Sequence, residues 1–322
     1  MNCICKNGDC MFSYNINQKD GKIFVAIPDK IKYNFNFLNS VTELMEKTMN
    51  SKCGKVYLSC NSSNIDFNKM GAAYLYNTLL FLAKWKVVYV DRELSQLLHE
   101  QVTHTDGSKF QKIDLQNSLK PEQQCYCFKD DKAVNKTVQI LVDFITENNL
   151  VLELEDAKEF LITTIGEIFS NAFNHSDENK VYFMYDIEVH EGKVFLIINI
   201  TDYGKTIIGN VQEYQKKVYK KELSPKESIV WAMQNGHTTR VGSGGYGLPT
   251  LVDYVKEING ELLIFSDTCM YALKGTIENI LDSKGIFIGT SVSMKIPLYD
   301  TTKVLVCDKK NNHITSINLD QI

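Results

Sequence analysis

Residues 159–176 carry the most regular hydrophobic pattern in this chain. On a helical wheel at about 100° per residue, the apolar side chains share one continuous arc. They are Leu161, Ile162, Ile165, Ile168, Phe169, Ala172 and Phe173. Glu167, Asn171 and Asn174 form a separate polar stripe at i, i+4 and i+7. The pattern predicts a long helix with one face packed on a sheet, although such a stripe taken alone is more typical of a solvated face.

Strand and helix patterns alternate on both sides of this helix. Upstream, strands are predicted at residues 24–28, 55–60 and 87–91, and helices at 41–49, 68–83 and 135–149. Downstream, strands are predicted at 180–189 and 193–201, and a helix begins at residue 248 before two further strands. A strand, a helix and a second strand with short connections form a right-handed parallel unit, so the sequence predicts an α/β fold.

The same patterns divide the chain into four parts. Residues 1–102 are predicted to form a small α/β domain, and the polar residues 103–134 a linker or irregular arm. Residues 135–300 are predicted to form a second domain, and residues 301–322 a C-terminal extension. A length of 322 residues suits two domains.

Charge and apolar runs exclude several classes of protein. The net charge is −4, from 35 Lys and Arg against 39 Asp and Glu, without the basic excess of a protein that binds nucleic-acid phosphates. The apolar run at residues 194–198 is far shorter than the ~20 residues that cross a bilayer, and the first residues lack a signal-peptide pattern. We expect a cytoplasmic protein that binds neither membranes nor nucleic acid. The nine cysteines lack an obvious zinc-site pattern, which favours free thiols.

The predicted strand 193–201 runs directly into Asp202-Tyr203-Gly204. An aspartate that closes a buried strand can accept a hydrogen bond from an exocyclic amine, such as the N6 group of adenine. The adjacent glycine lets a flat ring approach the backbone. By itself, however, Asp-x-Gly is a common turn.

Two glycine-containing segments follow. Residues 242–249 read Gly-Ser-Gly-Gly-Tyr-Gly-Leu-Pro and open a helix with Pro249 in its first turn. Free backbone N–H groups at a helix N-terminus form an anion site that suits phosphates. The segment is not a Walker A loop, because no Lys-Ser/Thr pair follows the glycines, and it comes too late for a Rossmann loop. Gly289-Thr290 then leads into a terminal strand of alternating pattern.

In order and spacing, these four elements resemble the N, G1, G2 and terminal Gly-Thr boxes of the GHKL superfamily. This superfamily includes sensor histidine kinases, anti-sigma serine kinases and type II topoisomerases. The resemblance covers residues 150–298 and implies an ATP-binding domain of the Bergerat type, an α+β two-layer sandwich. It also implies ATP and Mg²⁺ as cofactors.

The resemblance assigns roles to individual residues. Asn171 would help to hold Mg²⁺ against the triphosphate, and Glu167 would be the catalytic carboxylate that activates water or a hydroxyl group. Asp202 would bind N6 of adenine with support from Thr290. The resemblance and the patterns described above together predict these nucleotide-binding residues: Asn171, Asn174, Asp202, Gly204, Arg240, Gly242, Gly244, Gly245, Gly247 and Thr290.

The chain departs from the superfamily pattern at Thr206, where the G1 box has its second glycine. If this position requires a positive φ, the threonine is strained there. Residues 207–241 correspond to the ATP lid of the superfamily. They include a basic helix whose lysines are typical of a solvated face: Lys216, Lys217, Lys220 and Lys221. Ser224 and Glu227 predict a capping box at the start of a second lid helix.

Residues 55–91 resemble a STAS domain, the fold of anti-anti-sigma factors. Asn68-Lys69-Met70-Gly71 falls where that family has Asp-Ser-Ser-Gly. Because Lys69 and Met70 replace the serines, the resemblance implies an interaction module that is not phosphorylated at these positions.

Two functions stay open from the sequence. The chain is either an enzyme, an ATP hydrolase or an anti-sigma-type protein kinase, or a nucleotide-gated interaction protein with little turnover. Glu167 favours the enzyme, because a binding module has no need of a carboxylate at that position. In both cases we expect an unidentified protein partner, and the sequence leaves a homodimer open.

Overall fold

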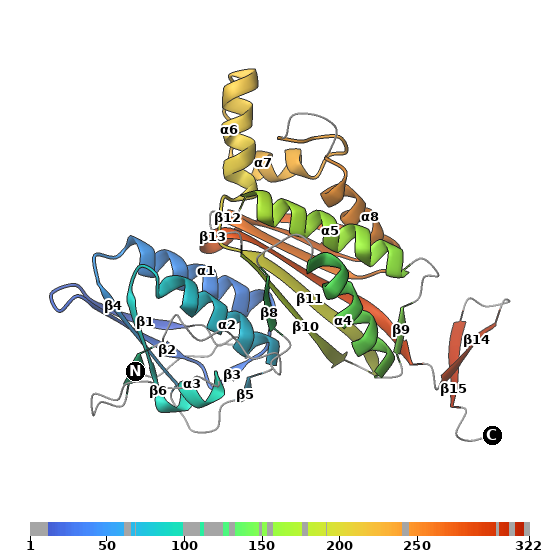
Figure 1. Ribbon diagram of the computed structural model, residues 1–322, viewed down its shortest axis with the longest axis horizontal. Helices are drawn as coiled ribbons and strands as arrows, with labels where there is room; N and C mark the ends of the chain where they lie inside the picture. The colour runs from blue at the N-terminus through green and yellow to red at the C-terminus, as the bar shows by residue number, and fades with distance from the viewer. Residues whose placement is uncertain are drawn as a thin grey trace.

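The structure is a computed structural model that describes residues 12–60, 66–67, 69–98, 110–112, 125–128, 133–147, 150–152, 157–175, 180–190, 192–239, 245–300, 303–308 and 313–318. Its helices and strands form a mixed α/β fold, which confirms the predicted class. Two large sheets are present, and two helices lie between them (Figure 1).

The first sheet belongs to the N-terminal unit, which we define as residues 12–98. Its strands lie in the order β1-β2-β4-β6-β7. Their bounds are β1 Ser13–Asn17, β2 Lys22–Ile27, β4 Lys55–Cys60, β6 Val87–Asp91 and, from beyond the unit, β7 Phe110–Lys112. β2, β4 and β6 run parallel, and β1 and β7 form antiparallel edges. The parallel strands agree with the strand–helix–strand pattern of the sequence.

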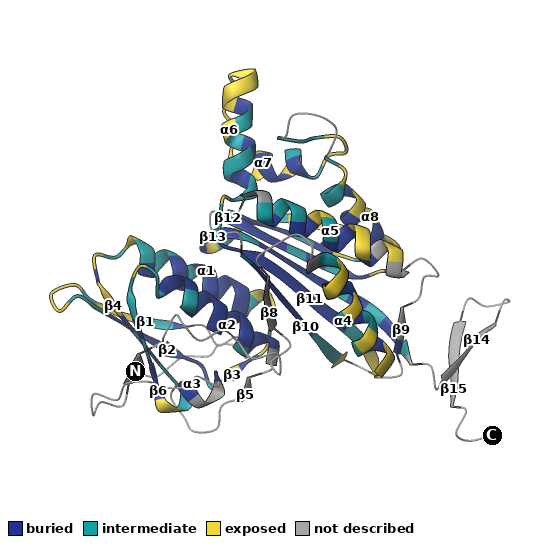
Figure 2. Ribbon diagram, viewed as in Figure 1, coloured by how far each residue is buried: buried dark blue, intermediate teal, exposed yellow. Residues whose placement is uncertain are grey.

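The helices of the N-terminal unit are α1 Phe35–Asn50, α2 Lys69–Leu82 and α3 Arg92–Leu97, and two short strands, β3 Lys30–Ile31 and β5 Asp66–Phe67, pair with each other. α1 begins after Asn34, whose side chain accepts a hydrogen bond from the Phe37 backbone N–H. α2 is buried on almost all sides, and its buried residues run without a break from 73 to 79 (Figure 2). A helix that is apolar all round is suited to such a place.

The second sheet is antiparallel throughout, with the strand order β12-β13-β11-β10-β8, and β9 pairs with the end of β13. The bounds are β8 Cys125–Phe128, β9 Leu150–Leu152, β10 Val181–His190, β11 Lys193–Asp202, β12 Glu261–Lys274 and β13 Ile277–Asp300. Three helices pack on one face of this sheet: α4 Ala133–Glu147, α5 Ala157–His175 and α8 Gly247–Glu257. α6 Ile207–Tyr219 and α7 Pro225–Ala232 lie between β11 and α8 in the chain.

The second sheet is covered on both faces. Alternate residues of a strand point to opposite sides. Leu196, Ile198 and Ile200 of β11 pack in a core with α5 and α8. Ile197 of the same strand and Tyr203 directly after it pack in a different core, together with α1 and α2. The molecule therefore has four layers, in the order sheet, helices, sheet, helices.

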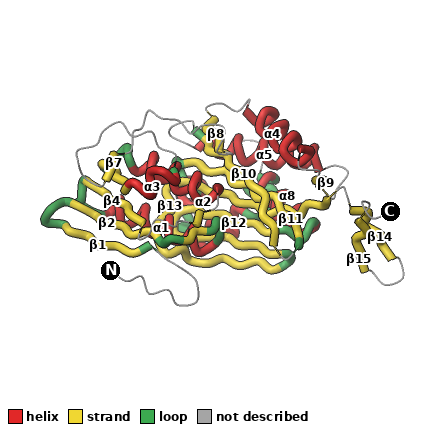
Figure 3. The backbone as a smooth tube through the Cα atoms, turned by 90° about the horizontal axis from the view of Figure 1, so that it is seen from below, coloured by secondary structure: helices red, strands yellow, loops and turns green. Residues whose placement is uncertain are grey.

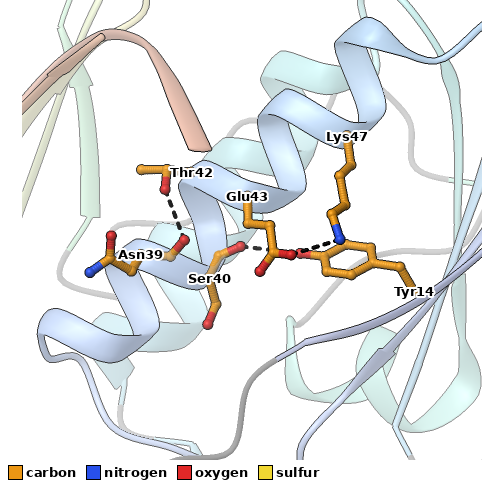
Figure 4. A network of polar contacts seen from close by, with 6 residues as sticks. All are labelled: Tyr14, Asn39, Ser40, Thr42, Glu43 and Lys47. Carbon is orange, nitrogen blue, oxygen red and sulfur yellow. Dashed lines mark hydrogen bonds and ion pairs between the residues drawn. The ribbon is translucent and has the colours of Figure 1, made fainter. Parts of the chain in front are cut away.

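α1 is attached to both sheets. On one side, the Tyr14 hydroxyl of β1 donates to the Ser40 carbonyl oxygen at 3.3 Å, and the Lys47 ammonium lies 4.2 Å from the centre of the Tyr14 ring (Figure 4). On the other side, the Asn39 carboxamide oxygen accepts a hydrogen bond of 3.1 Å from the Lys284 backbone N–H of β13. These contacts connect the N-terminal unit to the second sheet along β13.

The structure has strands in two parts of the chain where the sequence predicted none. Residues 103–134 include β7 and β8, each at the edge of one sheet. Residues 301–322 include β14 Lys303–Asp308 and β15 His313–Asn318, which pair with each other beyond the end of β13 (Figure 3). Of the helices in the described ranges, none has the length and apolar character that crossing a bilayer requires.

Candidate functional site

A cavity of about 210 Å³ opens between α5, the end of β11 and the beginning of α8. Its wall contains residues that the sequence singled out: Glu167, Asn171, Asp202, Gly245, Gly247 and Thr290. Most of the remaining wall on the sheet and on α5 is apolar, with contributions from Ile168, Ala172, Ile200 and Val292. Apolar walls with a few converging polar groups are typical of small-molecule sites.

α5 presents Glu167 and Asn171 to this cavity. The opposite side of the helix is anchored by side chains that are fully buried: Leu161, Ile165 and Phe169. Because one helical turn separates Glu167 from Asn171, both side chains lie on the same face. Asn174 also lies in α5, but its side chain falls outside the described part of the structure.

Asp202 closes β11 at the base of the cavity. The residue is 4% exposed, and its Oδ1 atom has no hydrogen-bond partner. Burial raises the pKa of this carboxyl group well above its ordinary value, although a hydrogen bond from the Gly204 backbone N–H opposes the shift. A buried polar atom without a partner is rare in folded proteins. On the wall of a cavity, it indicates a ligand that donates a hydrogen bond.

Thr290 lies opposite Asp202 in the pairing of β11 with β13. The preceding residue, Gly289, has a φ of 120°, and a side chain at that position would overlap the Asp202 carbonyl oxygen. The glycine therefore lets β13 come close to the end of β11, which brings Thr290 and Asp202 to the same cavity wall.

The N-terminus of α8 lies directly against Glu167. A Cβ atom at Gly247, the first residue of α8, would be 2.9 Å from Oε2 of Glu167. Gly245 has a φ of 84°, and a side chain there would overlap the His237 backbone. The Gly245 carbonyl oxygen accepts a hydrogen bond of 3.1 Å from the Gly236 N–H. The turn around Gly236 and His237 therefore lies against the N-terminus of α8, where backbone N–H groups can stabilise negative charge.

Thr206, directly before the predicted lid, corrects one expectation from the sequence. Thr206 has a φ of −70° and is the N-cap of α6, where its hydroxyl accepts a hydrogen bond of 2.9 Å from the Gly209 N–H. The strain considered for this position is therefore absent. The capping box of Ser224 and Glu227 is confirmed at the start of α7. The predicted basic residues of this region are exposed on and after α6: Lys216, Lys217, Lys220 and Lys221.

The cavity wall also contains residues that were not predicted from the sequence, among them Lys205, Trp231 and His237. Lys205 directly follows Asp202-Tyr203-Gly204 and forms an ion pair with Glu213 of α6. The Trp231 and His237 rings are stacked with their centroids 4.6 Å apart, and His237 Nδ1 lies 3.0 Å from the Trp231 carbonyl oxygen. The sequence pointed to these residues only indirectly, because they lie within or next to the predicted lid.

Other predicted site residues are placed differently. Arg240, Gly242 and Gly244 lie outside the described residues. Gly204 does not line the cavity, but its backbone N–H holds the Asp202 carboxyl group.

Asn171 of α5 has the chemistry of a residue that could share a magnesium ion with a ligand. Within the described ranges, no group of three or more His, Cys, Asp or Glu side chains could hold a metal ion. Mg²⁺ beside a nucleotide is usually bound by one or two protein oxygens together with phosphates and water. Asn171 offers a carboxamide oxygen on one wall of the cavity as such a protein ligand.

The interpretation of this cavity depends on its own residues and motifs. No known protein family matches this chain, and no curated protein matches it.

Proposed function

We propose that this chain binds Mg²⁺-ATP in the cavity between α5 and α8, through a GHKL-type domain of the Bergerat fold in residues 135–300. It hydrolyses the ATP or transfers the terminal phosphate to a partner protein. The observation that carries this proposal is Asp202, a buried acid at the base of the cavity, whose Oδ1 atom has no partner and whose neighbours Ile200 and Val292 are apolar. The resemblance of the four sequence motifs to the GHKL boxes supports the same ligand.

The chemistry of the cavity base suits adenine. Ile200 and Val292 flank Asp202 and Thr290 on adjacent strands and offer apolar surface to a flat ring. The ionised Asp202 carboxylate only accepts hydrogen bonds, so it suits the amino group at C6 of adenine. Guanine has a carbonyl oxygen in the same place, which the carboxylate would repel.

The phosphates would extend from the base toward the N-terminus of α8. Backbone N–H groups at this helix end are suited to bind anions, and Gly247 lets the Glu167 side chain pack closely beside them. Asn171 would hold Mg²⁺ between the protein and the phosphates, as the GHKL resemblance implies. Lys205 supplies a positive charge on the same cavity wall.

Glu167 supports the enzymatic form of the proposal. Its carboxylate lies against the first residue of α8, where the terminal phosphate would be bound. A carboxylate in this place can accept a proton from the attacking water or hydroxyl group. Phosphoryl transfer needs little beyond this base, correct positioning and neutralisation of charge.

A nucleotide-gated switch is the second candidate function. α6 projects from the body of the molecule, and Val218 and Tyr219 at its end are exposed (Figures 1 and 2). Because α6 and α7 also contribute to the cavity wall, a bound nucleotide would contact the element that carries this exposed end.

Labelled ATP separates these candidates. Purified protein is mixed with Mg²⁺ and ATP labelled at the γ-phosphate, with and without candidate partners. For an enzyme we expect the label in inorganic phosphate or on a partner protein, and its absence there for Glu167→Ala. Bound ATP that keeps its label under all conditions would favour the switch. A protein that does not bind ATP in the presence of Mg²⁺ would contradict both candidates.

A further inference from the structure

Asp202 and Tyr203 are consecutive residues that face opposite sides of the second sheet. Asp202 lines the cavity, whereas Tyr203 is buried in the core that the sheet shares with α1 and α2. The reversal follows from the alternation of side chains along a strand. Two adjacent residues therefore connect the base of the cavity to the N-terminal unit.

Tyr203 is held mainly by α2. Its ring is stacked on that of Phe81, with centroids 4.5 Å apart and an angle of 13° between the planes. Its hydroxyl lies 3.3 Å from Thr78 Oγ1, also in α2. Tyr182 of β10 makes an edge contact at 5.5 Å, and Phe287 of β13 lies at 6.0 Å. Tyr203 is 6% exposed, so it has little space in which to move independently.

The backbone between these two residues is also confined from the side of β13. A Cβ atom at Gly289 would be 2.8 Å from the Tyr203 Cα atom and would overlap the Asp202 carbonyl oxygen. The Gly204 N–H, one residue further, donates to the Asp202 carboxyl group. Residues 202–204 thus form one closely packed turn, and a displacement of the Tyr203 side chain would also displace the Asp202 carboxyl group.

Further along β11 and β13, buried polar side chains also connect the sheet under the cavity to α2. The Thr201 hydroxyl donates to Asn199 Oδ1 at 2.7 Å, and Asn199 Nδ2 donates to Ser291 Oγ at 2.9 Å. These three polar residues are almost fully buried. The Tyr74 hydroxyl of α2 lies against Ser291 and Thr201. The sheet under the cavity is therefore attached to α2 at more than one point.

We propose that Tyr203 is a positioning residue for nucleotide recognition, and that α2 sets the position of the Asp202 carboxyl group through it. This inference rests on the proposed function, because it concerns the residue proposed to bind adenine. It makes the N-terminal unit part of the nucleotide site, so a change in the position of α2 changes the affinity for ATP.

Two matched substitutions test this role. Phe81→Leu removes the ring stack on Tyr203 but keeps an apolar side chain. Met184→Leu instead removes a different contact of α2 with the second sheet, the 3.6 Å hydrogen bond from Asn77 Nδ2 to Met184 Sδ in the same core. Tyr203→Phe is the conservative variant, because it keeps the ring and leaves Thr78 Oγ1 donating to the Tyr74 carbonyl oxygen at 3.0 Å. We measure the binding of Mg²⁺-ATP and of Mg²⁺-tripolyphosphate, which lacks a base, by calorimetry.

Phe81→Leu should weaken ATP binding roughly tenfold, the effect of weakening one hydrogen bond to a charged group. Its binding of tripolyphosphate should change by less than about twofold, because the phosphates are bound by α5 and α8. Met184→Leu and Tyr203→Phe should keep the wild-type ratio of the two affinities. Equal losses for both ligands in Phe81→Leu, or the same ratio as in Met184→Leu, would show that Tyr203 has only a structural role.

Hydrogen exchange of the protein without ligand gives a second measurement that does not depend on ATP. Phe81→Leu should speed the exchange of the backbone amides of residues 202–204 relative to Met184→Leu. Unchanged exchange would overturn the positioning role even if ATP binds. Faster exchange in a protein that binds no ATP would instead overturn the proposed function and leave the contact between α2 and residues 202–204 intact.

Discussion

Gly289 packs so closely against the Asp202 carbonyl oxygen that any side chain at position 289 would overlap it. Gly289 also has a φ of 120°, which residues with a side chain rarely adopt. Packing and backbone conformation therefore both restrict this position to glycine. Because Asp202 and Thr290 line the cavity next to this contact, the glycine is needed for the site as well as for the pairing of β11 with β13.

Gly289→Ala should lower the free energy of unfolding by about 2–5 kcal/mol, from backbone strain together with the forced displacement of β11. It should also weaken ATP binding, because the displacement moves Asp202. Chemical denaturation and calorimetry measure the two effects. Gly54→Ala is a suitable control, since a Cβ atom there meets nothing within 4 Å and its φ is not positive. Similar stabilities for the two variants would contradict the argument.

The preference for ATP over GTP should increase with pH. Burial raises the pKa of Asp202, so the acid stays protonated to a higher pH than an exposed aspartate. Below the raised pKa, the protonated acid can donate a hydrogen bond to the guanine carbonyl oxygen, and the two nucleotides bind more equally. Above it, the carboxylate accepts from adenine and repels guanine, and we expect a preference of roughly ten- to hundredfold. Dissociation constants for both nucleotides across this pH range provide the test.

The same group should make stability depend on pH in the absence of nucleotide. A raised pKa in the folded state means that the folded protein holds its proton more tightly than the unfolded chain. Protonated Asp202 therefore stabilises the folded protein fully below the pKa of this residue in the unfolded chain. This stabilisation is lost as the pH rises through the pKa of Asp202 in the folded protein. Asp202→Asn cannot ionise, so it should remove both this dependence and the pH dependence of ATP preference. A pH profile that is the same in wild type and Asp202→Asn would exclude Asp202 as its source.

The local parts of the structure could be predicted from the sequence. The apolar arc of α5 and the capping box of Ser224 and Glu227 depend on contacts between residues a few positions apart. The strands β10 and β11 were predicted as two runs rich in apolar residues with a break between them. Thr206 is different, because a superfamily pattern favours glycine there, whereas the start of α6 favours an N-cap residue.

The cover on the second face of the sheet could not be predicted in the same way. Asn199 and Thr201 alternate with apolar residues in β11, a pattern typical of a strand with one face in water. They are buried instead, because Tyr74 of α2 lies on them. The relevant signal was in α2, which is too apolar on all sides to cover only one sheet.

The positions of Trp231 and His237 on the cavity wall could not be predicted from the sequence either. Trp231 lies in α7 and His237 follows this helix, so their stacking depends on the turn between them. The hydrogen bond from the Gly236 N–H to the Gly245 carbonyl oxygen holds this turn next to the start of α8. Such contacts join segments whose separation is set by the fold and not by any local pattern.

Glu167→Ala and Asn171→Ala should have different effects on the proposed reaction. Loss of the carboxylate should leave ATP affinity nearly unchanged and reduce turnover roughly 10²–10⁴-fold, the usual contribution of a general base. Loss of the carboxamide should weaken binding that depends on Mg²⁺. Turnover assays and titrations with and without Mg²⁺ distinguish the two. If wild type shows no turnover with any partner and Glu167→Ala behaves identically, the enzyme is excluded and the nucleotide-gated switch stands.

Removal of residues 1–102 should leave a fragment that exposes the uncovered face of the second sheet. The apolar side chains on that face include Met184, Ile197, Phe265, Met270 and Phe287, all buried in the core shared with α1 and α2. Burial of one such side chain contributes about 1.5–3 kcal/mol, so together they are comparable with the 5–15 kcal/mol that stabilises a typical domain.

We therefore expect the fragment of residues 103–322 to aggregate or to bind a hydrophobic dye, and to unfold without a cooperative transition. A matched deletion of residues 301–322 removes β14 and β15, which pair only with each other among the described strands, and should leave the rest folded. Size-exclusion chromatography, dye fluorescence and thermal unfolding of both fragments provide the comparison. A monomeric 103–322 fragment with cooperative unfolding would show that the second sheet is stable without α1 and α2, and that the four layers are not one folding unit.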